Sequence, residues 1–543
     1  YQFDTLIPWG TPIQPGGPSY DGTGERPTAD EQLEQTGLGH DGMWFFPMGR
    51  GNDEGMLAIN HEYGTNFHVF GEDREPISLE EVRRSQHVHG VSVVKIKKMG
   101  GQWQVVSSPN ARRITPNTPV TFSGPVANSD LLKNKANSPT LGTVNNCANG
   151  YTPWGTYLTC EENFNGYFGD STYDPETETG SWTPTEAQSR YGFSPTGFGY
   201  GWYTFDPRFD LSNPDYVNEE NRFGWVVEID PMDGSQIPVK RTALGRCKHE
   251  GVALAIGRGG RAVAYMGDDE RFDYIYKFVS ESNWRSMQAR GISPLDRGVL
   301  YAARFNDDGR GDWVELSMNN PDVAAKFNSQ EEVLTFARMA ADAAGATPMD
   351  RPEWTTVAPD GKVYCALTNN TRRKEPNPAN PIVETNEEGE IIGNPNGHII
   401  QFLDDDNHVG TTFSWNIFVI ASDTQGDGDE TSFSSPDGLW ADPEGRLFIE
   451  TDGGQPKGLN DQMLVANTAT GEIRRMFTGV AGCEVTGITV TPDRRTMFIN
   501  LQHPGDGDPA VTNFPAPFTG ASGPVPRDAT VVITRKDGGI IGS

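Results

Sequence analysis

The feature that most constrains this fold is a strand–turn–strand pattern that recurs along the chain with acidic or polar residues at its ends. The clearest copy runs from Pro436 to Asp452, with two apolar strands on either side of a tight turn at Glu444-Gly445. Five further copies begin at Cys483, Pro352, His249, Asn146 and His40. A hairpin unit cannot bury its apolar face alone, so repeated units stack on their neighbours. Six copies predict a closed ring of six four-stranded blades, which is a β-propeller.

Composition agrees with an all-β fold in one domain. The 63 glycines and 39 prolines among 543 residues suit many short strands and turns. Capping patterns predict short helices only near residues 78–86 and 330–344. We therefore expect an all-β, six-bladed β-propeller over 1–543, decorated by small helical and loop insertions and by an N-terminal segment of about 1–39. A tandem of β-sandwiches is the alternative, but it would not place equivalent polar residues in every repeat.

The charge of the chain excludes several classes of partner. Acidic residues number 74 against 44 basic ones, a net charge of −30. Such a surface repels nucleic-acid backbones and anionic lipid, so we expect no nucleic-acid or membrane partner and a monomer that acts on small molecules. High Gly, Asn and Asp with low Lys favours a periplasmic or secreted protein, and the chain opens at Tyr1 without a leader. The five widely spaced cysteines do not form a disulfide scaffold or zinc pattern.

The repeats also predict a cation site. In a propeller the first strand of each blade lines the central channel, so polar residues at equivalent strand ends converge on one mouth. Two carboxylates about 4 Å apart repel by about 4 kcal/mol at an effective dielectric constant near 20, so a cluster requires bound cations. Carboxylate oxygens favour Ca²⁺. The expected metal ligands are Glu62, Glu161, Glu162, Glu250, Asp268, Glu270, Asp437 and Glu484, with Asp41, Asp269, Glu450 and Asp452 in the same convergent set.

Two further features point beyond calcium. Cys160 ends a strand beside Glu161 and Glu162, and a thiolate is a better ligand for iron, zinc or copper than for calcium. Strand alternation aims Cys160 and Glu162 the same way, although a bulge could substitute Glu161. Arg372 lies in a basic run at one strand end, where its guanidinium matches phosphate oxygens in a bidentate way. An anionic substrate that bridges metal ions and is clamped by arginine would use both groups.

The segment Trp154-Gly155-Thr156-Tyr157-Leu158-Thr159-Cys160-Glu161-Glu162-Asn163 closely resembles the PhoX family of alkaline phosphatases. Further matches are Lys248-His249-Glu250-Gly251, Met266-Gly267-Asp268-Asp269, Thr368-Asn369-Asn370-Thr371-Arg372 and Asn500-Leu501-Gln502-His503-Pro504-Gly505. The resemblance implies a six-bladed propeller, twin-arginine export, and a phosphomonoesterase with two ferric ions and calcium ions joined by an oxo group. It also implies Cys160 as the iron thiolate and Glu250 as a metal ligand.

The same resemblance implies that Arg372 and one asparagine of the Asn145-Asn146 pair, with Asn146 preferred, contact phosphate. The metals would bind phosphoryl oxygens while an activated oxygen attacks phosphorus in line. The expected role is phosphate scavenging by hydrolysis of phosphomonoesters. Two alternatives remain open. One is a calcium-only propeller hydrolase of phytase or lactonase type, and the other is a non-enzymatic propeller with structural calcium.

Overall fold

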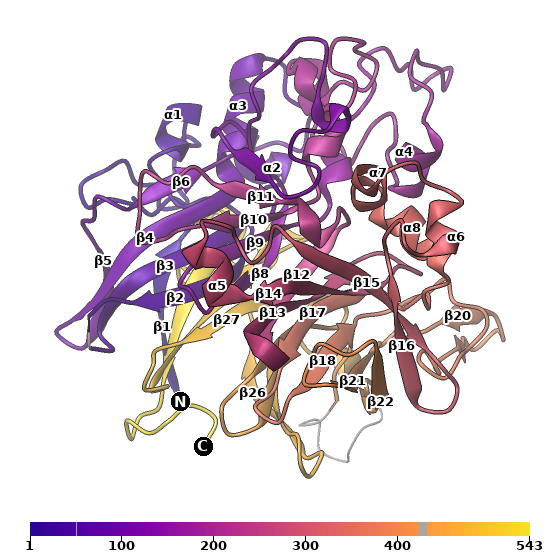
Figure 1. Cartoon of the computed structure of the whole chain (residues 1–543). Helices are drawn as coiled ribbons and strands as arrows, with labels where there is room; N and C mark the ends of the chain where they lie inside the picture. Colours follow the sequence, from indigo (N-terminus) through magenta and orange to yellow (C-terminus); the bar gives the residue numbers. More distant parts are fainter. Residues whose placement is uncertain (50, 423–431) are drawn as a thin grey trace.

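The computed structural model describes residues 1–49, 51–422 and 432–543, and sheets dominate them (Figure 1). Within these ranges four blade-like sheets are separate, and the remaining strands form a nine-stranded sheet and a two-stranded ribbon. Helices are short, and no helix within the described ranges is long and apolar enough to cross a membrane. The all-β, propeller-like arrangement predicted from the repeats is confirmed.

The sheets are built mainly from hairpins in chain order. The first contains β2 (His40–Pro47), β3 (Glu54–His61), β4 (Gly90–Met99) and β5 (Gln102–Val106), with β6 (Arg112–Ile114) paired to β4. The second contains β8 (Asn146–Tyr151), β9 (Tyr157–Glu161), β10 (Val226–Ile229), β11 (Val239–Arg241) and β7 (Thr121–Ser123). A later sheet contains β23 (Pro436–Ala441), β24 (Arg446–Thr451), β25 (Gln462–Asn467) and β26 (Ile473–Thr478).

The nine-stranded sheet joins two hairpin series through their outer strands. One series runs β12 (His249–Gly257), β13 (Arg261–Asp268), β14 (Ile275–Asn283), β15 (Gly298–Phe305) and β16 (Arg310–Glu315). The other runs β17 (Pro352–Val357), β18 (Lys362–Leu367), β21 (His398–Asp404) and β22 (Thr412–Ile420). β16 pairs with β22, so β12 and β17 lie at the two ends of the sheet. A separate ribbon of β19 (Glu384–Thr385) and β20 (Ile391–Gly393) projects from the second series.

The last sheet is completed by the start of the chain. β27 (Glu484–Val490), β28 (Thr496–Gln502) and β29 (Ala529–Thr534) follow one another, and β1 (Gln2–Pro8) pairs antiparallel with β29. The chain termini accordingly lie close together in Figure 1. The expectation that residues of about 1–39 only decorate the propeller is wrong for β1. Its pairing ties the N-terminal strand to the C-terminal sheet, because an unpaired β29 would expose a row of backbone donors and acceptors.

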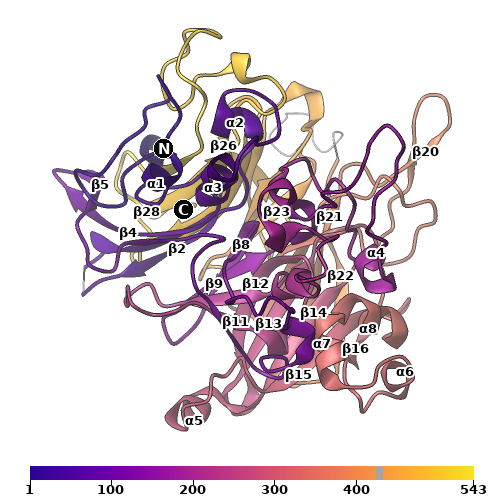
Figure 2. The same ribbon diagram turned by 90° about the horizontal axis from the view of Figure 1, so that it is seen from above.

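The first strands of successive hairpin series pack against one another around the channel. β2 contacts β8 and β27, β12 contacts β8 and β17, and β23 contacts β17 and β27. The view from above shows the sheets fanned around these strands (Figure 2). Because all six strands run from the same end, their N-terminal residues gather at one mouth of the channel.

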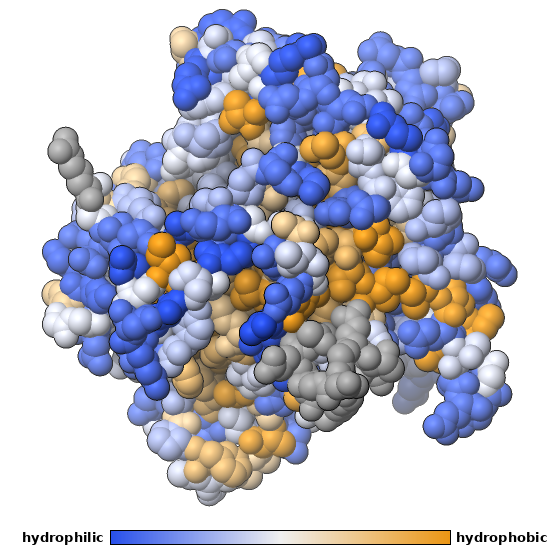
Figure 3. Space-filling model, turned by 90° about the horizontal axis from the view of Figure 1, so that it is seen from below, coloured by the Kyte–Doolittle hydropathy of each residue, from blue (hydrophilic) through white to orange (hydrophobic). Residues whose placement is uncertain are grey.

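Short helices occupy the insertions. They are α1 (Ala29–Gln32), α2 (Asn66–Phe70), α3 (Leu79–Val88), α4 (Glu186–Arg190), α5 (Trp284–Ala289), α6 (Pro321–Ala324), α7 (Gln330–Thr335) and α8 (Ala337–Ala344). Ser78 caps α3 and Ser329 caps α7 through their side chains, as the capping patterns predict. The segment 330–344 is interrupted at Phe336, whose φ of −119° and ψ of 48° are not helical. On the face of the molecule seen from below, hydrophobic residues appear among the hydrophilic ones (Figure 3).

The closure by β1 can be tested within one strand. Ile7 is fully buried in the core formed with Phe45 and Phe498, whereas Phe3 is 61% exposed. Ile7→Ala should lower the free energy of unfolding by about 2–5 kcal/mol because it opens a cavity. Phe3→Ala is the matched control and should change it by less than about 0.5 kcal/mol. Denaturant unfolding measures both free energies. Equal losses of stability in the two variants would contradict a stabilising role for the buried face of β1.

Candidate metal centre

Six side chains at the starts of the innermost strands form the floor of one channel mouth. Five of them occupy the second position of their strand, and the sixth occupies the first position of β27. They are Asp41, Cys147, Glu250, Glu353, Asp437 and Glu484. All six are buried, between 0% and 7% exposed. The structure therefore brings chemically reactive groups from every part of the ring to one place.

β-Bulges turn these side chains toward the channel. The register shifts between His40 and Met43 on β2, and equivalent shifts occur near the start of β8, β12, β17, β23 and β27. A bulge leaves one residue unpaired and re-aims its side chain. Strand proximity also depends on Gly42, where a Cβ would lie 2.8 Å from the backbone of Ala148. Glycine there lets β2 and β8 approach closely enough for Asp41 to meet Cys147.

A second layer comes from the residue that follows the second strand of each hairpin. Antiparallel pairing returns that residue to the mouth where the first strand began. These residues are Glu62, Glu162, Asp269, Asp452 and His503. In the part of the chain that the structure describes, four of them, all except Asp269, join floor residues in groups whose ligand atoms lie within 4.8 Å of one another. The groups are Asp41–Glu62–Cys147, Cys147–Glu162–Glu250, Glu250–Glu353–Asp437 and Asp452–Glu484–His503.

Cys147 links two of these groups. Its Sγ lies 2.8 Å from Oδ2 of Asp41 and 3.0 Å from Oε1 of Glu250. Such spacings suit ligands that share an ion. Oε2 of Glu250 and Oδ1 of Asp437 are buried and have no hydrogen-bond partner among the described residues. Buried carboxylate oxygens without a donor are costly unless a cation satisfies them, so the residues present fit a metal centre.

Burial sets the protonation of the cluster. It raises the pKa of Asp41 to about 6, and raises the pKa of Glu62, Glu250 and Asp437 well above the usual range of a carboxyl group, with neighbouring carboxylates adding to the effect. Burial likewise raises the pKa of the Cys147 thiol, and nearby carboxylates raise it further. Metal binding at this mouth therefore requires the ions to displace protons.

Positively charged side chains neutralise part of the acidic charge at the edge of the mouth, which we call the rim. Arg351 donates to both carboxylate oxygens of Asp269 at 2.8 and 2.7 Å and lies 3.2 Å from Glu353. Lys248 lies 3.0 Å from Glu270. These pairs hold Asp269 and Glu270 on the side of the mouth where β12 and β17 meet.

The structure does not place Cys160, the expected iron ligand, in any of the four groups within the described residues. Cys160 is fully buried in an apolar core with Leu158, Val252 and Met266, away from the carboxylate cluster. Burial raises the pKa of its thiol, as expected for a structural cysteine. The thiol of the cluster is Cys147. Cys160 precedes the mouth by two residues on β9, so its side chain packs one step deeper, between two sheets.

Three carboxylates proposed as ligands are instead committed to cations of the protein. Glu161 accepts from Lys240 at 2.7 Å and from the backbone N–H groups of Gly224 and Trp225 at 3.0 Å. Asp268 pairs with buried Arg338. These two residues end their strands and point away from the channel, because successive side chains alternate. Glu270 pairs with Lys248 and joins none of the four groups within the described residues. Of Glu161 and Glu162, which the sequence left as alternatives, only Glu162 lies in one of the four groups within the described residues.

The remaining predicted ligands are brought together. Glu62, Glu162, Glu250, Asp437 and Glu484 all lie in the four groups. Two members, Cys147 and Glu353, were missed although both lie in the repeat units. The signal that could have found them is position: each follows the first residue of its repeat, as Asp41, Glu250 and Asp437 do.

The two residues expected to contact phosphate differ in placement. Arg372 is exposed on the loop after β18, and its backbone N–H donates to Oδ1 of Asn370 at 3.1 Å. The Asn146 amide donates to Thr143 at 2.6 Å and Thr159 at 2.9 Å, so it is turned away from the mouth. The neighbouring Asn145 donates toward Oε1 of Glu62 at 3.4 Å. Asn145 is thus the asparagine of the pair that faces the cluster.

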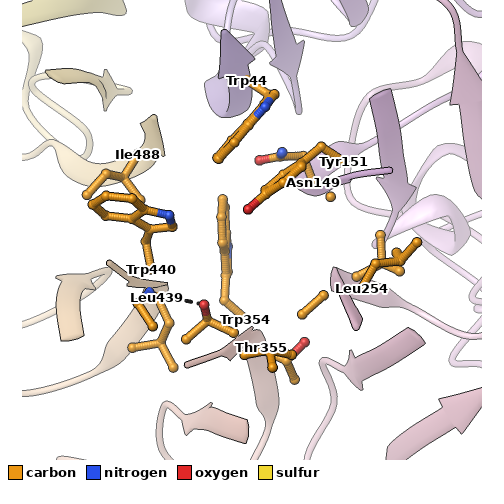
Figure 4. A pocket seen from close by; sticks show the side chains of 15 residues that line it. Trp44, Asn149, Tyr151, Leu254, Trp354, Thr355, Leu439, Trp440 and Ile488 are labelled. Carbon is orange, nitrogen blue, oxygen red and sulfur yellow. Dashed lines mark hydrogen bonds between the residues drawn. The ribbon is translucent and has the colours of Figure 1, made fainter. Parts of the chain in front are cut away.

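The opposite end of the channel has a different character. Trp44, Tyr151, Trp354 and Trp440 line a hollow of about 70 Å³ there, and Figure 4 shows them converging from separate strands. Trp44 stacks on Tyr151 with ring centroids 3.5 Å apart. Aromatic side chains therefore fill the end of the channel that lies away from the carboxylates.

The raised pKa values predict how metal-free protein responds to pH. A carboxyl whose pKa is higher in the folded than in the unfolded state stabilises the fold at low pH, and this contribution is lost as pH rises through the folded pKa. After chelation, the melting temperature should fall by several degrees as pH rises from about 4 through the pKa of about 6 of Asp41 and on toward the higher pKa values of Glu62 and Glu250. Metal-loaded protein is the control and should show a smaller fall. A flat profile after verified chelation would contradict a converging cluster.

One family of known proteins matches this chain over most of its length. A family model described as alkaline phosphatase PhoX matches residues 1–505. The solved structure of PhoX from Pseudomonas fluorescens in complex with vanadate, a transition state analogue, is 43% identical, with a TM-score of 0.88 over 100% of this chain and 96% of that chain. The NanB sialidase from Streptococcus pneumoniae is 9% identical, with a TM-score of 0.38 over 96% and 72% of the two chains. No curated protein matched. The chain therefore belongs to the PhoX family of alkaline phosphatases, which are phosphomonoester hydrolases.

Proposed function

We propose that the chain hydrolyses small phosphomonoesters, for phosphate scavenging, at a mixed iron and calcium centre in the channel mouth. The observation that carries this proposal is the position of the Cys147 thiol, 2.8 and 3.0 Å from two carboxylates in a cluster otherwise made of oxygen ligands and one histidine. Oxygen ligands alone favour calcium, whereas a thiolate favours a transition metal.

The donor sets divide accordingly. Cys147 with Asp41, Glu62, Glu162 and Glu250 would hold the iron, as two groups that share the thiol. Glu250, Glu353 and Asp437 offer only oxygen and would hold calcium. Asp452, Glu484 and His503 form a further group nearer the solvent, with the His503 Nε2 3.6 Å from Glu484 Oε2.

The chain's own residues would position the substrate at this mouth. Bound cations would supply Lewis-acid polarisation of the phosphoryl group. Arg372, exposed and without a carboxylate partner in the described residues, would hold phosphoryl oxygens through its planar fork. Asn145 would offer its amide beside Glu62. The burial of the floor would exclude bulk water from the reacting atoms, which strengthens each electrostatic interaction.

We also infer that the whole chain is one six-bladed propeller. The six channel-lining strands and the pairing of β16 with β22 support counting the nine-stranded sheet as two blades joined at their outer edges. Export to the periplasm or the medium is part of the same proposal, since an enzyme that scavenges phosphate meets its esters there. Action as a monomer is proposed as well.

The calcium-only alternative differs in one respect that can be measured. It assigns no role to the Cys147 thiol. The burial of Cys147 among carboxylates would then destabilise the fold with no metal–sulfur bond to compensate. The proposal of a non-enzymatic propeller does not agree with membership of a phosphatase family.

The role of Cys147 can be separated from that of Cys160. A thiolate bound to ferric iron absorbs visible light, so the native protein should be coloured and contain iron and calcium. Cys147→Ala should lose the colour, most of the iron and the phosphatase activity. Cys160→Ala is the control: it removes a buried core thiol and should keep colour and iron content while losing some stability. Elemental analysis and absorption spectra measure this. A colourless, iron-free and fully active native protein would contradict the mixed centre.

The role of Arg372 predicts a substrate preference. A guanidinium that binds a dianionic phosphoryl group should favour phosphomonoesters over diesters. Arg372→Ala should lower kcat/KM for a phosphomonoester by about ten- to a thousandfold, the range for loss of a charge-assisted clamp. Steady-state kinetics on a monoester and its matched diester measure it. An unchanged kcat/KM would remove Arg372 from the site.

A further inference from the structure

Two arginines near the channel mouth stand out because they are not neutralised. The chain has 74 acidic and 44 basic residues, so a cation near this mouth usually meets a carboxylate. Arg351, Arg338 and Lys248 each do so. Within the described residues, Arg271 and Arg372 form no ion pair and their guanidinium groups donate no hydrogen bond. The Nε of Arg271 is buried without an acceptor there.

The chain path brings these two arginines to the same part of the rim. Arg271 follows β13 by three residues, and Arg372 lies on the loop after β18. An isolated antiparallel bridge joins Arg271 to Asp350, and Asp350 accepts from Arg373 at 2.5 Å. The guanidinium of Arg373 also lies over the ring of Phe272, 5.1 Å from its centroid. The two loops are therefore held side by side, with Arg373 committed to the protein and Arg372 left free.

Their charges act on each other. Burial lowers the pKa of Arg271, and the positive charges of Arg351 and Arg372 lower it further against the opposing effect of Glu270. Keeping two guanidinium groups close without an anion between them costs free energy. A partly buried Nε–H without an acceptor adds to this cost. An anion placed between the two groups would remove both penalties.

We propose that Arg271 is a further substrate-binding residue, which together with Arg372 clamps the phosphoryl group of the phosphomonoester. This inference rests on the proposed function, in which Arg372 binds phosphate. Guanidinium forks match phosphate oxygens in a bidentate way, and two forks suit a group with two negative charges. The pair would therefore select dianionic monoesters against monoanionic diesters and would bind inorganic phosphate as well.

The test uses the metal-loaded protein and the variant Arg271→Gln, which keeps the length of the side chain and removes its charge. Its kcat/KM for an aryl phosphomonoester should fall by about ten- to a hundredfold, and the inhibition constant of inorganic phosphate should rise by a similar factor. For the matched aryl phosphodiester, kcat/KM should fall by less than about threefold. Arg285→Gln, exposed on α5, is the control for the loss of one positive charge and should change none of these values.

Three results would overturn the inference. The first is an unchanged phosphate inhibition constant in Arg271→Gln. The second is an equal loss of monoester and diester activity, which would indicate a structural role. The third is loss of bound metal or a lowered melting temperature as the source of the defect. A native protein that hydrolyses no phosphomonoester would instead refute the proposed function, so the two failures are distinguishable.

Discussion

Repulsion among buried carboxylates is the constraint on which the rest of this structure depends. Asp41, Glu250 and Glu353 project from three separate strands into one small, water-poor space. Charges so close in a medium of low dielectric constant oppose the ring closure that apolar packing favours. Fixed hydrogen-bond donors stabilise some of these carboxylates. The hydroxyl of Thr486 donates to Asp41 at 2.7 Å, and Arg351 binds the Asp269 carboxylate. Thr486 thus satisfies one oxygen of Asp41 and Arg351 neutralises Asp269, and the other floor carboxylates remain for cations.

The repeat pattern predicted much of this arrangement. It identifies the first strands of the hairpins and places Glu62, Glu250 and Asp437 at a common mouth. Two of its errors, at Glu161 and Asp268, share a cause. A strand alternates its side chains, so an error of one residue exchanges a channel ligand for a structural carboxylate, as with Glu161 and Glu162. The local sequence does not show which of two consecutive residues faces the channel after a β-bulge.

Other features could not be predicted because they depend on partners far away in the chain. The pairing of β1 with β29 joins residues more than 500 positions apart, and nothing in Gln2–Pro8 itself specifies that neighbour. From its local sequence Glu161 is a candidate metal ligand. Its ion pair with Lys240, which lies 79 residues later in the chain, is visible only in the folded structure. Cys147 near the start of β8 and Cys160 near the end of β9 lie at the same end of one hairpin, and only the packing of adjacent sheets separates a core thiol from one that faces carboxylates.

The aromatic side chains at the far end of the channel affect how substrate enters the enzyme and how products leave it. Trp354 directly follows Glu353, so the same strand that contributes a carboxylate to the mouth also obstructs the channel beneath it. A propeller channel open at both ends would let reactants enter one way and products leave the other. Here ester, alcohol and phosphate must enter and leave through the same mouth of the channel. Release of phosphate then precedes entry of the next ester, and the product competes directly with the substrate for the vacated site.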